Sequence, residues 1–342
     1  MKETRARAPL RLGLAGGGTD VSPYCDIHGG AVLNATIDRY AYATIIPNDS
    51  GFIRIIASDQ NIEVSQEKAF PLPMNGVLDL HVCVYNYFIR EYLAGEPISL
   101  DLVTFCDAPA GSGLGSSSTL VVSMVRAFVE FLNLGLDDYR VAFLAYKIER
   151  FDCNLQGGRQ DQYAATFGGF NFMEFNASDR VVVNPLRVKT WIVCELEASL
   201  LLYFTGVSRE SAKIIAEQSS NVQAGSEITI DAMHGLKREA YAMKECLLRG
   251  DIDGIVDTMR QGWLNKKLSA SSVSNSNIDH IFNAAIKAGA LAGKVSGAGG
   301  GGFMLLMVPP SKRMSVARKL VEFGGQVSNC HFTDLGSQAW SI

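Results

Sequence analysis

The spacing of hydrophobic and polar residues predicts a strand-rich first part of the chain. Residues 41–47 and 52–58 are rich in β-branched side chains and are separated by the polar turn "NDSG", so both are predicted strands. Residues 81–93 are predicted to form a helix. A strand over 98–107 leads into a glycine-rich loop. The residues after that loop, 119–132, are apolar on nearly every helical face, which predicts a helix buried on most sides.

Glycines and acidic residues predict where the next elements begin and end. Gly135 is a candidate C-terminal glycine for the buried helix. The acidic start "LDD" opens a second helix over 138–151. The segment "NLQGGRQDQYAATFGGFNFMEF" then predicts a glycine-rich loop, a short helix and a strand.

The pattern changes after about residue 180. A strand over 198–206 is followed by three helices between residues 208 and 260, and the chain closes with a strand, a helix and a strand over 301–308, 311–325 and 326–332. A chain of 342 residues is too long for one ordinary core. The predicted fold class is therefore α+β, with two domains over residues 1–180 and 181–342.

One helix of the second domain carries clear start and stop signals. Residues 275–290 are amphipathic, with Ile278, Ile281, Phe282, Ala285 and Ile286 on one face. Asn277 or Ser276 is predicted to cap its start, and Gly289 to end it.

Charge and composition exclude several classes of partner. The formal net charge of −4 and the lack of a basic cluster argue against a nucleic-acid surface. No apolar run approaches the roughly 18 residues of a membrane span, and "MKETRARAP" is not followed by the apolar stretch of a signal peptide. The expected location is the cytoplasm, with no membrane or nucleic-acid partner.

The cysteines and histidines suggest no covalent or metal framework. The seven cysteines are scattered, none forms a C-x-x-C, and the five histidines lack metal-binding spacing. Neither a disulfide nor a zinc site is expected, and the predicted setting is reducing.

The most informative motif is "PAGSGLGSSST", residues 109–119. Glycines let backbone N–H groups turn inward, and a following helix adds unpaired N–H donors and partial positive charge, so the string favours an anion site. The alternative is an N-cap serine after an ordinary loop. The motif is not a Walker loop, because no lysine precedes its hydroxyls.

A second motif, "RAPLRLGLAGGGTDVSPY", lies near the N-terminus. Arg11 on its predicted strand can stabilise negative charge on a transferring phosphoryl group. Asp20 in the open turn can accept hydrogen bonds from sugar hydroxyls. The alternatives are a surface ion pair for Arg11 and a turn residue or helix cap for Asp20.

The third motif, "KVSGAGGGGFMLL", contains a literal G-x-G-x-x-G at Gly297, Gly299 and Gly302. A dinucleotide fingerprint follows a strand and opens a helix, whereas these glycines open a predicted strand. We therefore reject a dinucleotide fold and interpret the segment as a flexible loop beside an active site.

The three motifs in this order resemble the GHMP small-molecule kinase family, which includes galactokinase, homoserine kinase and mevalonate kinase. "GSGLGSSS" is the most specific of them, and "GGRQDQYAATFGG" is similar to the sugar-1-kinase branch that acts on heptose 7-phosphate. The resemblance covers the whole chain. It implies a ribosomal protein S5 domain 2-like N-terminal domain, a ferredoxin-like C-terminal domain, ATP and Mg²⁺ as cofactors, and a sugar phosphate acceptor for nucleotide-sugar biosynthesis.

The resemblance also implies roles for single residues. Asp161 would take the proton from the attacking hydroxyl or orient that hydroxyl, beside Arg11, and Ser117 with Glu149 would hold Mg²⁺. The alternatives are a cap of the short helix for Asp161 and an exposed helix charge for Glu149. The residues expected to bind ATP phosphates are Gly111, Ser112, Gly113, Leu114, Gly115, Ser116, Ser117 and Ser118.

The acceptor is expected against the first and third motifs. The candidate residues are Gly17, Gly18, Thr19, Asp20, Tyr24, Arg159, Gly297, Ala298, Gly299 and Gly300. Galactokinases usually carry Glu-His where this chain has Gly17-Gly18, which suggests room for a larger sugar. A second phosphate on that sugar needs a basic partner, for which the candidates are Arg159, Arg209, Lys213 and Lys267.

Two other functions remain open from the sequence. One is a kinase of another acceptor, such as a hexose, fucose or an isoprenoid alcohol. The other is a non-catalytic sugar and ATP sensor, although such a protein would be expected to lack Asp161 or Ser117 and both are present. A homodimer is the commonest assembly of soluble homo-oligomers.

Overall fold

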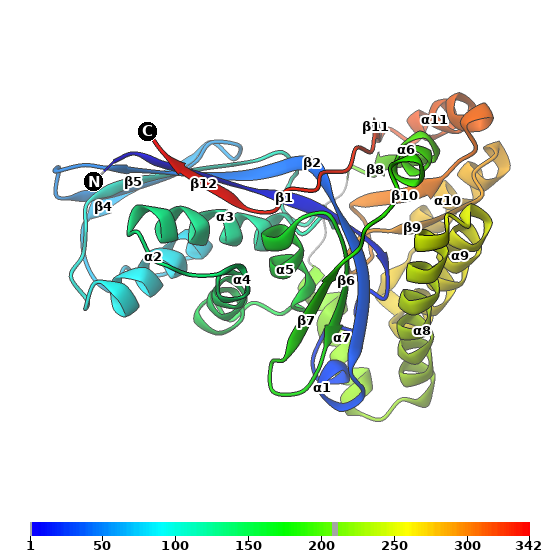
Figure 1. Cartoon of the computed structure of the whole chain (residues 1–342), viewed down its shortest axis with the longest axis horizontal. Helices are drawn as coiled ribbons and strands as arrows, with labels where there is room; N and C mark the ends of the chain where they lie inside the picture. The colour runs from blue at the N-terminus through cyan, green and yellow to red at the C-terminus, as the bar shows by residue number, and fades with distance from the viewer. Residues whose placement is uncertain (1, 207–210) are drawn as a thin grey trace.

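The computed structural model describes residues 2–206 and 211–342, and its two β-sheets follow one another along the long axis of the molecule (Figure 1). In these residues the first sheet has eight strands, ordered β12-β1-β2-β5-β3-β4, with β6 and β7 extending it from β2. Its strands are β1 (Thr4–Ala15), β2 (Gly30–Pro47), β3 (Phe52–Ala57), β4 (Ile62–Glu67), β5 (Leu100–Cys106), β6 (Phe170–Phe175), β7 (Val181–Pro185) and β12 (Gln338–Ser341).

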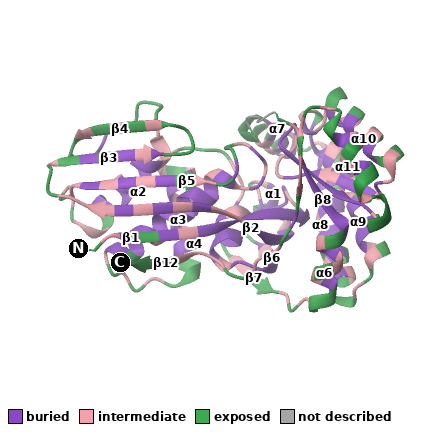
Figure 2. Ribbon diagram, turned by 90° about the horizontal axis from the view of Figure 1, so that it is seen from above, coloured by how far each residue is buried: buried purple, intermediate pink, exposed green. Residues whose placement is uncertain are grey.

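The strands predicted over 41–47, 52–58 and 98–107 are confirmed as parts of β2, β3 and β5. β2 and β3 are consecutive but do not pair, because β5 lies between them, antiparallel to β2 and parallel to β3. Figure 2 shows the resulting contrast between the largely buried β2 and the exposed β4 at the edge of the sheet.

Two strands from beyond residue 180 belong to this first sheet. β7 pairs antiparallel with β6, and β12 pairs antiparallel with β1, which brings the two chain ends close together (Figure 1). A boundary at residue 180 therefore does not separate the two sheets, because edge positions next to β6 and β1 are filled by strands that come later in the chain.

Helices of the N-terminal half cover one face of the first sheet (Figure 1). They are α1 (Tyr24–His28), α2 (Asp79–Tyr92), α3 (Ser116–Phe131), α4 (Asp138–Lys147), the π-helical turn η1 (Ile148–Asp152) and α5 (Gln160–Phe167). The central one is α3, which packs on β1 and β2 and also contacts α2, α4 and α5. Its buried side chains occupy all faces, as its continuous apolar sequence predicts.

The end of α3 differs from the prediction. Leu132 follows the last helical residue, and Asn133 takes the left-handed conformation, with φ 51°. Gly135 does not have a positive φ. Asn is the residue other than glycine that tolerates this conformation, because its short polar side chain can hydrogen-bond locally.

The second sheet is antiparallel, ordered β11-β8-β10-β9. Its strands are β8 (Leu200–Phe204), β9 (Ala292–Val295), β10 (Phe303–Met307) and β11 (Gln326–Asn329). The helices of this half are α6 (Thr190–Ser199), α7 (Ser211–Gln223), α8 (Glu227–Arg249), α9 (Ile252–Ser269), α10 (Ser276–Ala288) and α11 (Arg313–Val321), with the 3₁₀ turns η2 (Ser271–Val273) and η3 (Pro310–Lys312). The predicted three helices and the closing strand–helix–strand are confirmed; α6 is not among the predicted elements.

Helix α10 is capped one residue earlier than predicted. The side chain of Asn275 accepts hydrogen bonds from the N–H groups of Asn277 and Ile278. Gly289 ends the helix as predicted, with φ 118°. The prediction placed the cap inside the first turn because three polar residues in succession can all serve as N-caps.

A shared hydrophobic core joins the two halves. Leu12 of β1, Ala240 of α8 and Leu202 of β8 belong to the same buried cluster. Helix α8 packs on both β1 and β2, and α9 packs on β9. The first motif, at the end of β1, is therefore held between the two sheets.

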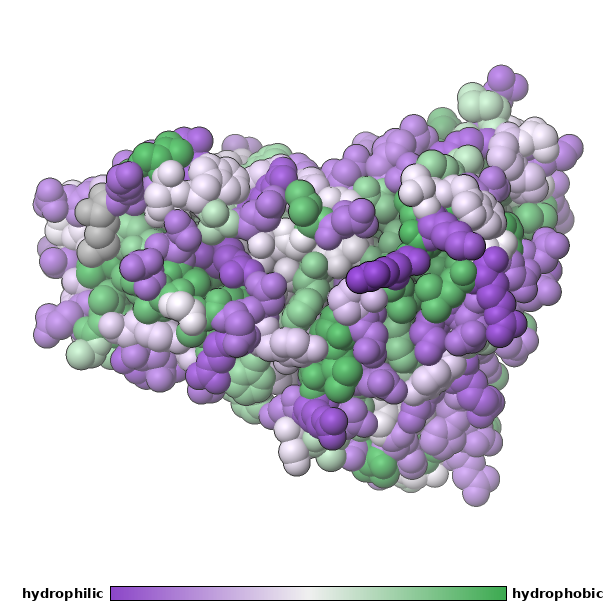
Figure 3. Space-filling model, viewed as in Figure 1, coloured by the Kyte–Doolittle hydropathy of each residue, from purple (hydrophilic) through white to green (hydrophobic). Residues whose placement is uncertain are grey.

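The surface of the molecule is mixed. On the face seen in Figure 3, hydrophobic residues form small groups among hydrophilic ones on both halves. Among the described residues, no helix has the length and apolar character needed to cross a membrane.

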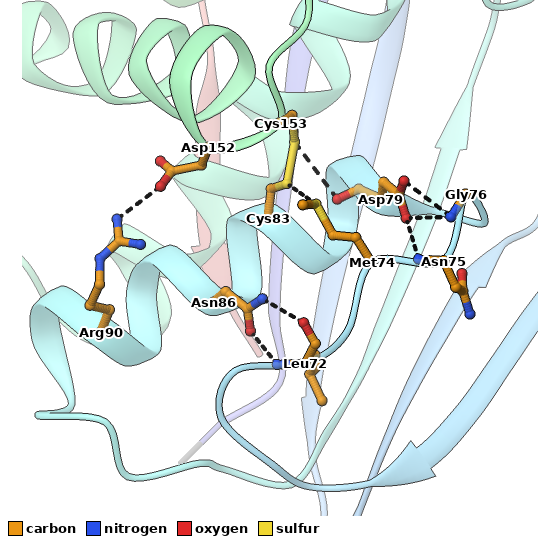
Figure 4. Close-up of a disulfide and its surroundings, with 10 residues drawn as sticks. All are labelled: Leu72, Met74, Asn75, Gly76, Asp79, Cys83, Asn86, Arg90, Asp152 and Cys153. Carbon is orange, nitrogen blue, oxygen red and sulfur yellow. Dashed lines mark hydrogen bonds and ion pairs between the residues drawn. A yellow bond between two sulfur atoms is a disulfide. The ribbon is translucent and has the colours of Figure 1, made fainter.

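The structure corrects the expectation that the cysteines form no disulfide. Cys83 of α2 and Cys153, which follows η1, are joined by a disulfide, with their Cα atoms 6.0 Å apart (Figure 4). They are 70 residues apart in sequence, so spacing gave no sign of the pair. The ion pair between Arg90 and Asp152, at 3.1 Å, joins the same two elements beside it.

Candidate active site

A cavity of about 460 Å³ lies between the two halves of the molecule. Its volume falls in the usual range for small-molecule sites. Its wall combines the end of the first motif, the glycine-rich loop before α3, the start of α5, and, from the second half, α7, α9 and the loop before β10. All three glycine-rich motifs thus meet at one place.

Alternate residues of the middle motif face the cavity. Gly111, Gly113 and Gly115 line it, whereas Ser112 and Leu114 are fully buried and do not. The main chain of the buried pair anchors the loop: Ser112 O accepts from Phe303 N at 2.8 Å, and Leu114 O accepts from Arg11 N at 3.1 Å. The predicted contribution of Ser112 and Leu114 is therefore limited to their backbone.

The loop runs directly into the N-terminus of α3. Gly115 is the N-cap residue, with φ 77°, and no side chain caps the helix. Ser116, Ser117 and Ser118 line the cavity from the first turn. Uncapped N–H donors and the positive end of the helix dipole facing a cavity make an anion site.

Arg11 and Asp161 form an ion pair beside this loop. The Nε and Nη2 atoms of Arg11 lie 2.7 and 2.6 Å from Oδ1 of Asp161, and Nη1 donates to the Gly113 carbonyl at 2.7 Å. In the described residues no group donates to Oδ2 of Asp161, although a Cβ on Gly115 would lie 3.2 Å from that atom. One carboxylate oxygen is thus fixed by Arg11 while the other is available to a ligand.

Asp20 supports the helix that carries Asp161. Its Oδ2 accepts from the N–H groups of Arg159 and Gln160 at 3.0 and 3.1 Å, and its Oδ1 accepts from Gly18 N and the Gln160 side chain at 3.1 and 3.0 Å. Asp20 is only 1% exposed, but it lines the cavity. The alternative role of helix cap is therefore present, and its predicted contact with sugar hydroxyls stays a prediction.

Glu149 occupies the π-helical turn η1 and lines the same cavity. Its side chain accepts from Gln162 at 2.6 Å and pairs with Arg150 at 3.2 Å. The Gln162 amide also donates to Ser118 Oγ at 3.2 Å, which links the turn to the start of α3.

A magnesium site fits the oxygen donors on this side of the cavity. Glu149 supplies a carboxylate and Ser117 a hydroxyl that bonds to no described residue; Mg²⁺ is commonly held by one or two such ligands with waters and phosphate oxygens. No group of three or more His, Cys, Asp or Glu side chains that could hold a metal occurs in residues 2–206 and 211–342.

Several residues predicted to contact the acceptor do not line the main cavity. The Thr19 hydroxyl lies 2.8 and 2.9 Å from the Gly16 and Ala31 carbonyls, which share its single donor. Tyr24 is buried against α8, where its hydroxyl lies 2.8 Å from Nδ1 of His234. Both side chains bond to the protein away from the cavity and hold the first motif in place. Their position does not support a direct contact with the acceptor.

Arg159 and two of the predicted glycines are also outside that wall. Arg159 forms ion pairs with Asp26 and Asp179 at 3.2 and 2.9 Å. Gly17 lines a smaller neighbouring cavity, and Gly300 donates its N–H to the Val273 carbonyl at 2.8 Å.

The remaining acceptor candidates are where the sequence placed them. Gly18 of the first motif, and Gly297, Ala298 and Gly299 of the third, all line the main cavity. The third motif also contacts the middle one, because Ser296 Oγ donates to the Gly113 carbonyl at 2.8 Å. As predicted, its glycines open a strand, β10.

Sequence analysis missed Lys266, which is the basic residue that α9 places in the cavity wall. Its Nζ donates to the Gly17 carbonyl at 2.9 Å. A signal was present: Lys266 continues the buried stripe of α9 formed by Ile255, Met259 and Trp263, where an apolar residue is expected.

Burial alters the ionisation of Lys266 and of two neighbours in the smaller cavity. Desolvation lowers the pKa of Lys266 to about 8, aided by the Arg11 charge and opposed by Asp20. Desolvation also lowers the pKa of Lys294 to about 7 and raises the pKa of Glu239 to about 7. Lys294 Nζ donates to the Leu14 carbonyl at 3.4 Å, so two lysines of the second half hold the backbone of the first motif.

Comparison with known proteins decides the family. The family models described as "GHMP kinases N terminal domain" and "GHMP kinases C terminal" match residues 79–169 and 243–326. The chain belongs to the GHMP kinase family. As a GHMP kinase it is a phosphotransferase with ATP as a substrate, and the expected two-domain α+β fold is confirmed.

Relatives of this GHMP kinase include proteins named as heptose phosphate kinases. It is 46% identical over 342 residues, the whole of both chains, to the D-glycero-alpha-D-manno-heptose 7-phosphate kinase of Campylobacter jejuni. A crystal structure of a D-glycero-D-manno-heptose 1-phosphate kinase from Bacteroides thetaiotaomicron is 46% identical, with a TM-score of 0.84 and 99% of each chain covered. Lactococcus lactis galactokinase, complexed with galactose, shares the fold at 16% identity, with a TM-score of 0.77 over 98% and 95% of the two chains.

Proposed function

We propose that this GHMP kinase transfers the γ-phosphoryl group of ATP to the anomeric hydroxyl of D-glycero-D-manno-heptose 7-phosphate, giving the 1,7-bisphosphate. The observation that carries the proposal is the Arg11–Asp161 pair, which lies in the cavity wall and bonds to the Gly113 carbonyl of the proposed phosphate-binding loop. The full-length relative named as a heptose 7-phosphate kinase supports this choice of acceptor.

The loop from Gly111 to Ser118 holds the triphosphate. Its inward-facing glycines and the uncapped start of α3 offer backbone N–H groups to the phosphate oxygens. Arg11 adds a fixed positive charge beside them, since its Nη1 already donates to the Gly113 carbonyl. Phosphoryl transfer depends mainly on such positioning and charge neutralisation.

Asp161 orients the acceptor hydroxyl and accepts its proton. Arg11 holds Oδ1, so the acceptor hydroxyl donates to Oδ2, which lies next to Gly115 at the end of the loop. As the anomeric oxygen bonds to the γ-phosphorus, its proton passes to Oδ2, and the bond from that phosphorus to the bridging oxygen of ADP breaks. Asp20 keeps Asp161 in place by capping α5.

Ser117 and Glu149 are the residues that would hold Mg²⁺. When bound, the ion neutralises charge on the phosphate oxygens. Gln162 positions the Glu149 carboxylate for this role by donating to it from α5.

A second acceptor has a specific observation in its favour. The Bacteroides thetaiotaomicron relative is named a heptose 1-phosphate kinase, in which the sugar already carries the anomeric phosphate. With that acceptor, phosphorylation of the 7-hydroxyl would give the same 1,7-bisphosphate, so the two candidates differ in which hydroxyl attacks.

One experiment separates the candidates. Purified enzyme is given ATP and Mg²⁺ with heptose 7-phosphate, heptose 1-phosphate, unphosphorylated heptose, fucose or galactose, and ADP release and the ³¹P NMR spectrum of the product are recorded. We expect rapid ADP release with heptose 7-phosphate and a new anomeric phosphate resonance. Turnover of heptose 1-phosphate alone would select the second candidate, and binding of sugar and ATP without ADP release would identify a sensor.

A further inference from the structure

Two of the residues first nominated to meet a phosphate on the acceptor, Arg159 and Lys267, are engaged elsewhere in the structure. Arg159 is held by two ion pairs outside the cavity wall. Lys267 pairs with Asp279 at 3.7 Å and lies over the Trp263 ring, 5.9 Å from its centroid. Arg209 lies outside the described residues, and Lys213 has other interactions.

Two of the basic residues in the wall of the main cavity are already engaged by the protein. Arg11 bonds to Asp161 and to a carbonyl of the middle motif. Arg150 donates to the Gly158 and Leu155 carbonyls and pairs with Glu149. These guanidinium groups hold the catalytic elements in place, so neither is available to bind the phosphate already present on the acceptor.

Lys266 differs from both. It is 5% exposed, reaches the cavity wall from α9, and has one hydrogen bond within the described residues, to the Gly17 carbonyl. An ammonium group has three donors, so two remain for a ligand. A buried cation in a ligand cavity with unused donors is costly unless an anion completes it.

Its neighbours place it on the acceptor side of the cavity. A Cβ on Gly18 would lie 2.8 Å from Lys266 Nζ and 3.6 Å from the Gln218 side-chain oxygen. Gln218 of α7 lines the same wall and donates to Ser269 Oγ at 2.6 Å. A side chain at position 18 would therefore collide with the Lys266 ammonium group, and glycine leaves room for it.

We propose that Lys266 is the specificity residue that receives the phosphate group already present on the acceptor. The inference rests on the proposed function, because it assumes a phosphorylated sugar beside the first motif. Charge complementarity supports it: Lys266 supplies a positive charge that no described carboxylate pairs with directly, and a phosphate dianion would supply the missing acceptor oxygens.

The test is the preference of the enzyme for a phosphorylated acceptor. The ratio of kcat/KM for heptose 7-phosphate to kcat/KM for unphosphorylated heptose is measured for wild type, Lys266→Met and Lys266→Arg. Lys267→Met is the matched control, because the neighbouring lysine does not line the cavity. We expect Lys266→Met to lower the ratio about 10- to 100-fold, the usual effect of removing a hydrogen bond to a charged group. Lys266→Arg should restore part of it, and Lys267→Met should leave it unchanged.

Two outcomes overturn the inference. If Lys266→Met lowers kcat/KM equally for both acceptors, Lys266 only braces Gly17. If it changes KM for ATP rather than for the sugar, it serves the nucleotide. Thermal unfolding, measured on each variant, identifies a folding defect. In that event the ratio is compared between Lys266→Gln and Lys266→Arg.

Failure of the proposed function has a different signature. Wild-type enzyme would then not transfer phosphate to heptose 7-phosphate at all, whatever residue 266 is. Inhibition of wild type and Lys266→Met by inorganic phosphate, competitive with the acceptor that is turned over, gives a second measure of the anion site. Equal inhibition constants in the two proteins would contradict a phosphate contact at Lys266.

Discussion

Arg11 contacts a single carboxylate oxygen of Asp161 with two of its nitrogens, at 2.7 and 2.6 Å, and uses its third nitrogen on the carbonyl of Gly113. This side chain of β1 therefore connects the proposed catalytic carboxylate of α5 to the proposed phosphate-binding loop. Because the Arg11 side chain is nearly fully buried, we expect its interaction with Asp161 to be strong.

The pair predicts non-additive kinetics. The test is a double-mutant cycle with the variants Arg11→Met, Asp161→Asn and the double variant. We expect each single substitution to lower kcat by nearly as much as the double substitution does. The measurement is kcat at saturating ATP and acceptor. Independent, multiplying effects would show that Arg11 acts on the phosphoryl group without acting through Asp161.

Gly115 is predicted to be intolerant of a side chain. Its φ of 77° is unfavourable for alanine, and a Cβ would press on Asp161 at 3.2 Å. Gly115→Ala should lower kcat/KM by about 10²-fold through a displaced carboxylate. Gly135→Ala is the control, because a Cβ there meets no atom within 4 Å. Equal activity of the two variants would argue against close packing of the loop on Asp161.

Acceptor binding should depend on pH through Lys266. Its pKa is lowered to about 8, so the ammonium form of the free enzyme is present below pH 8 and is lost above it. Binding of a phosphate dianion should therefore weaken as pH rises through 8, with KM for heptose 7-phosphate increasing while KM for ATP changes less. The charged groups around the site are Asp20, Arg11, Lys294 and Glu239.

The matched variant for the pH profile is Lys266→Arg. A guanidinium stays charged throughout the range, so the rise in KM should move to higher pH. An unchanged profile in this variant would assign the titration to another group.

Glu149→Gln should raise the Mg²⁺ concentration needed for half-maximal activity by at least about 10-fold, because a neutral amide is a poorer ligand for a hard cation. Glu91→Gln, on the exposed face of α2, is the control. Titration of activity with Mg²⁺ at fixed ATP provides the measurement. Identical Mg²⁺ dependence in Glu149→Gln and wild type would remove Glu149 from the metal site.

The disulfide predicts a redox-dependent stability. Reduction of the Cys83–Cys153 bond, which closes a loop of 70 residues, should lower the free energy of unfolding by about 2–4 kcal/mol. Peptide mapping without reductant, with the exposed Cys194 as an internal control, should recover the linked peptide. Complete alkylation of both cysteines in protein kept oxidising would contradict the bond.

Local chemistry explains which parts of the fold could be predicted from the sequence. The buried helix α3 and the glycine that ends α10 follow from apolar continuity and from the left-handed conformation that glycine permits. The pairing of β12 with β1 could not be predicted, because strand pairing across the whole chain leaves no local pattern.

In the candidate site too, residues in local motifs could be predicted, whereas contacts between distant parts of the chain could not. The middle loop and Asp161 were predicted to belong to the site because their motifs are short and specific, and both line the main cavity. Asp20 was predicted to bind the acceptor, with a turn residue or helix cap as the alternative, and all four of its hydrogen bonds are to the protein. The sequence does not show that the start of α5 folds back onto the first motif. Lys267 was nominated in place of Lys266, because a helical rotation of one residue decides which lysine faces the cavity.

The most direct test of the central claim is single-turnover phosphoryl transfer by Asp161→Asn. With enzyme in excess of ATP and with saturating heptose 7-phosphate and Mg²⁺, we predict a rate of bisphosphate formation about 10²- to 10⁴-fold below that of wild type, with ATP affinity within a few-fold of wild type. A transfer rate near that of wild type would contradict the account, because Oδ2 of Asp161 would then have no part in activating the acceptor.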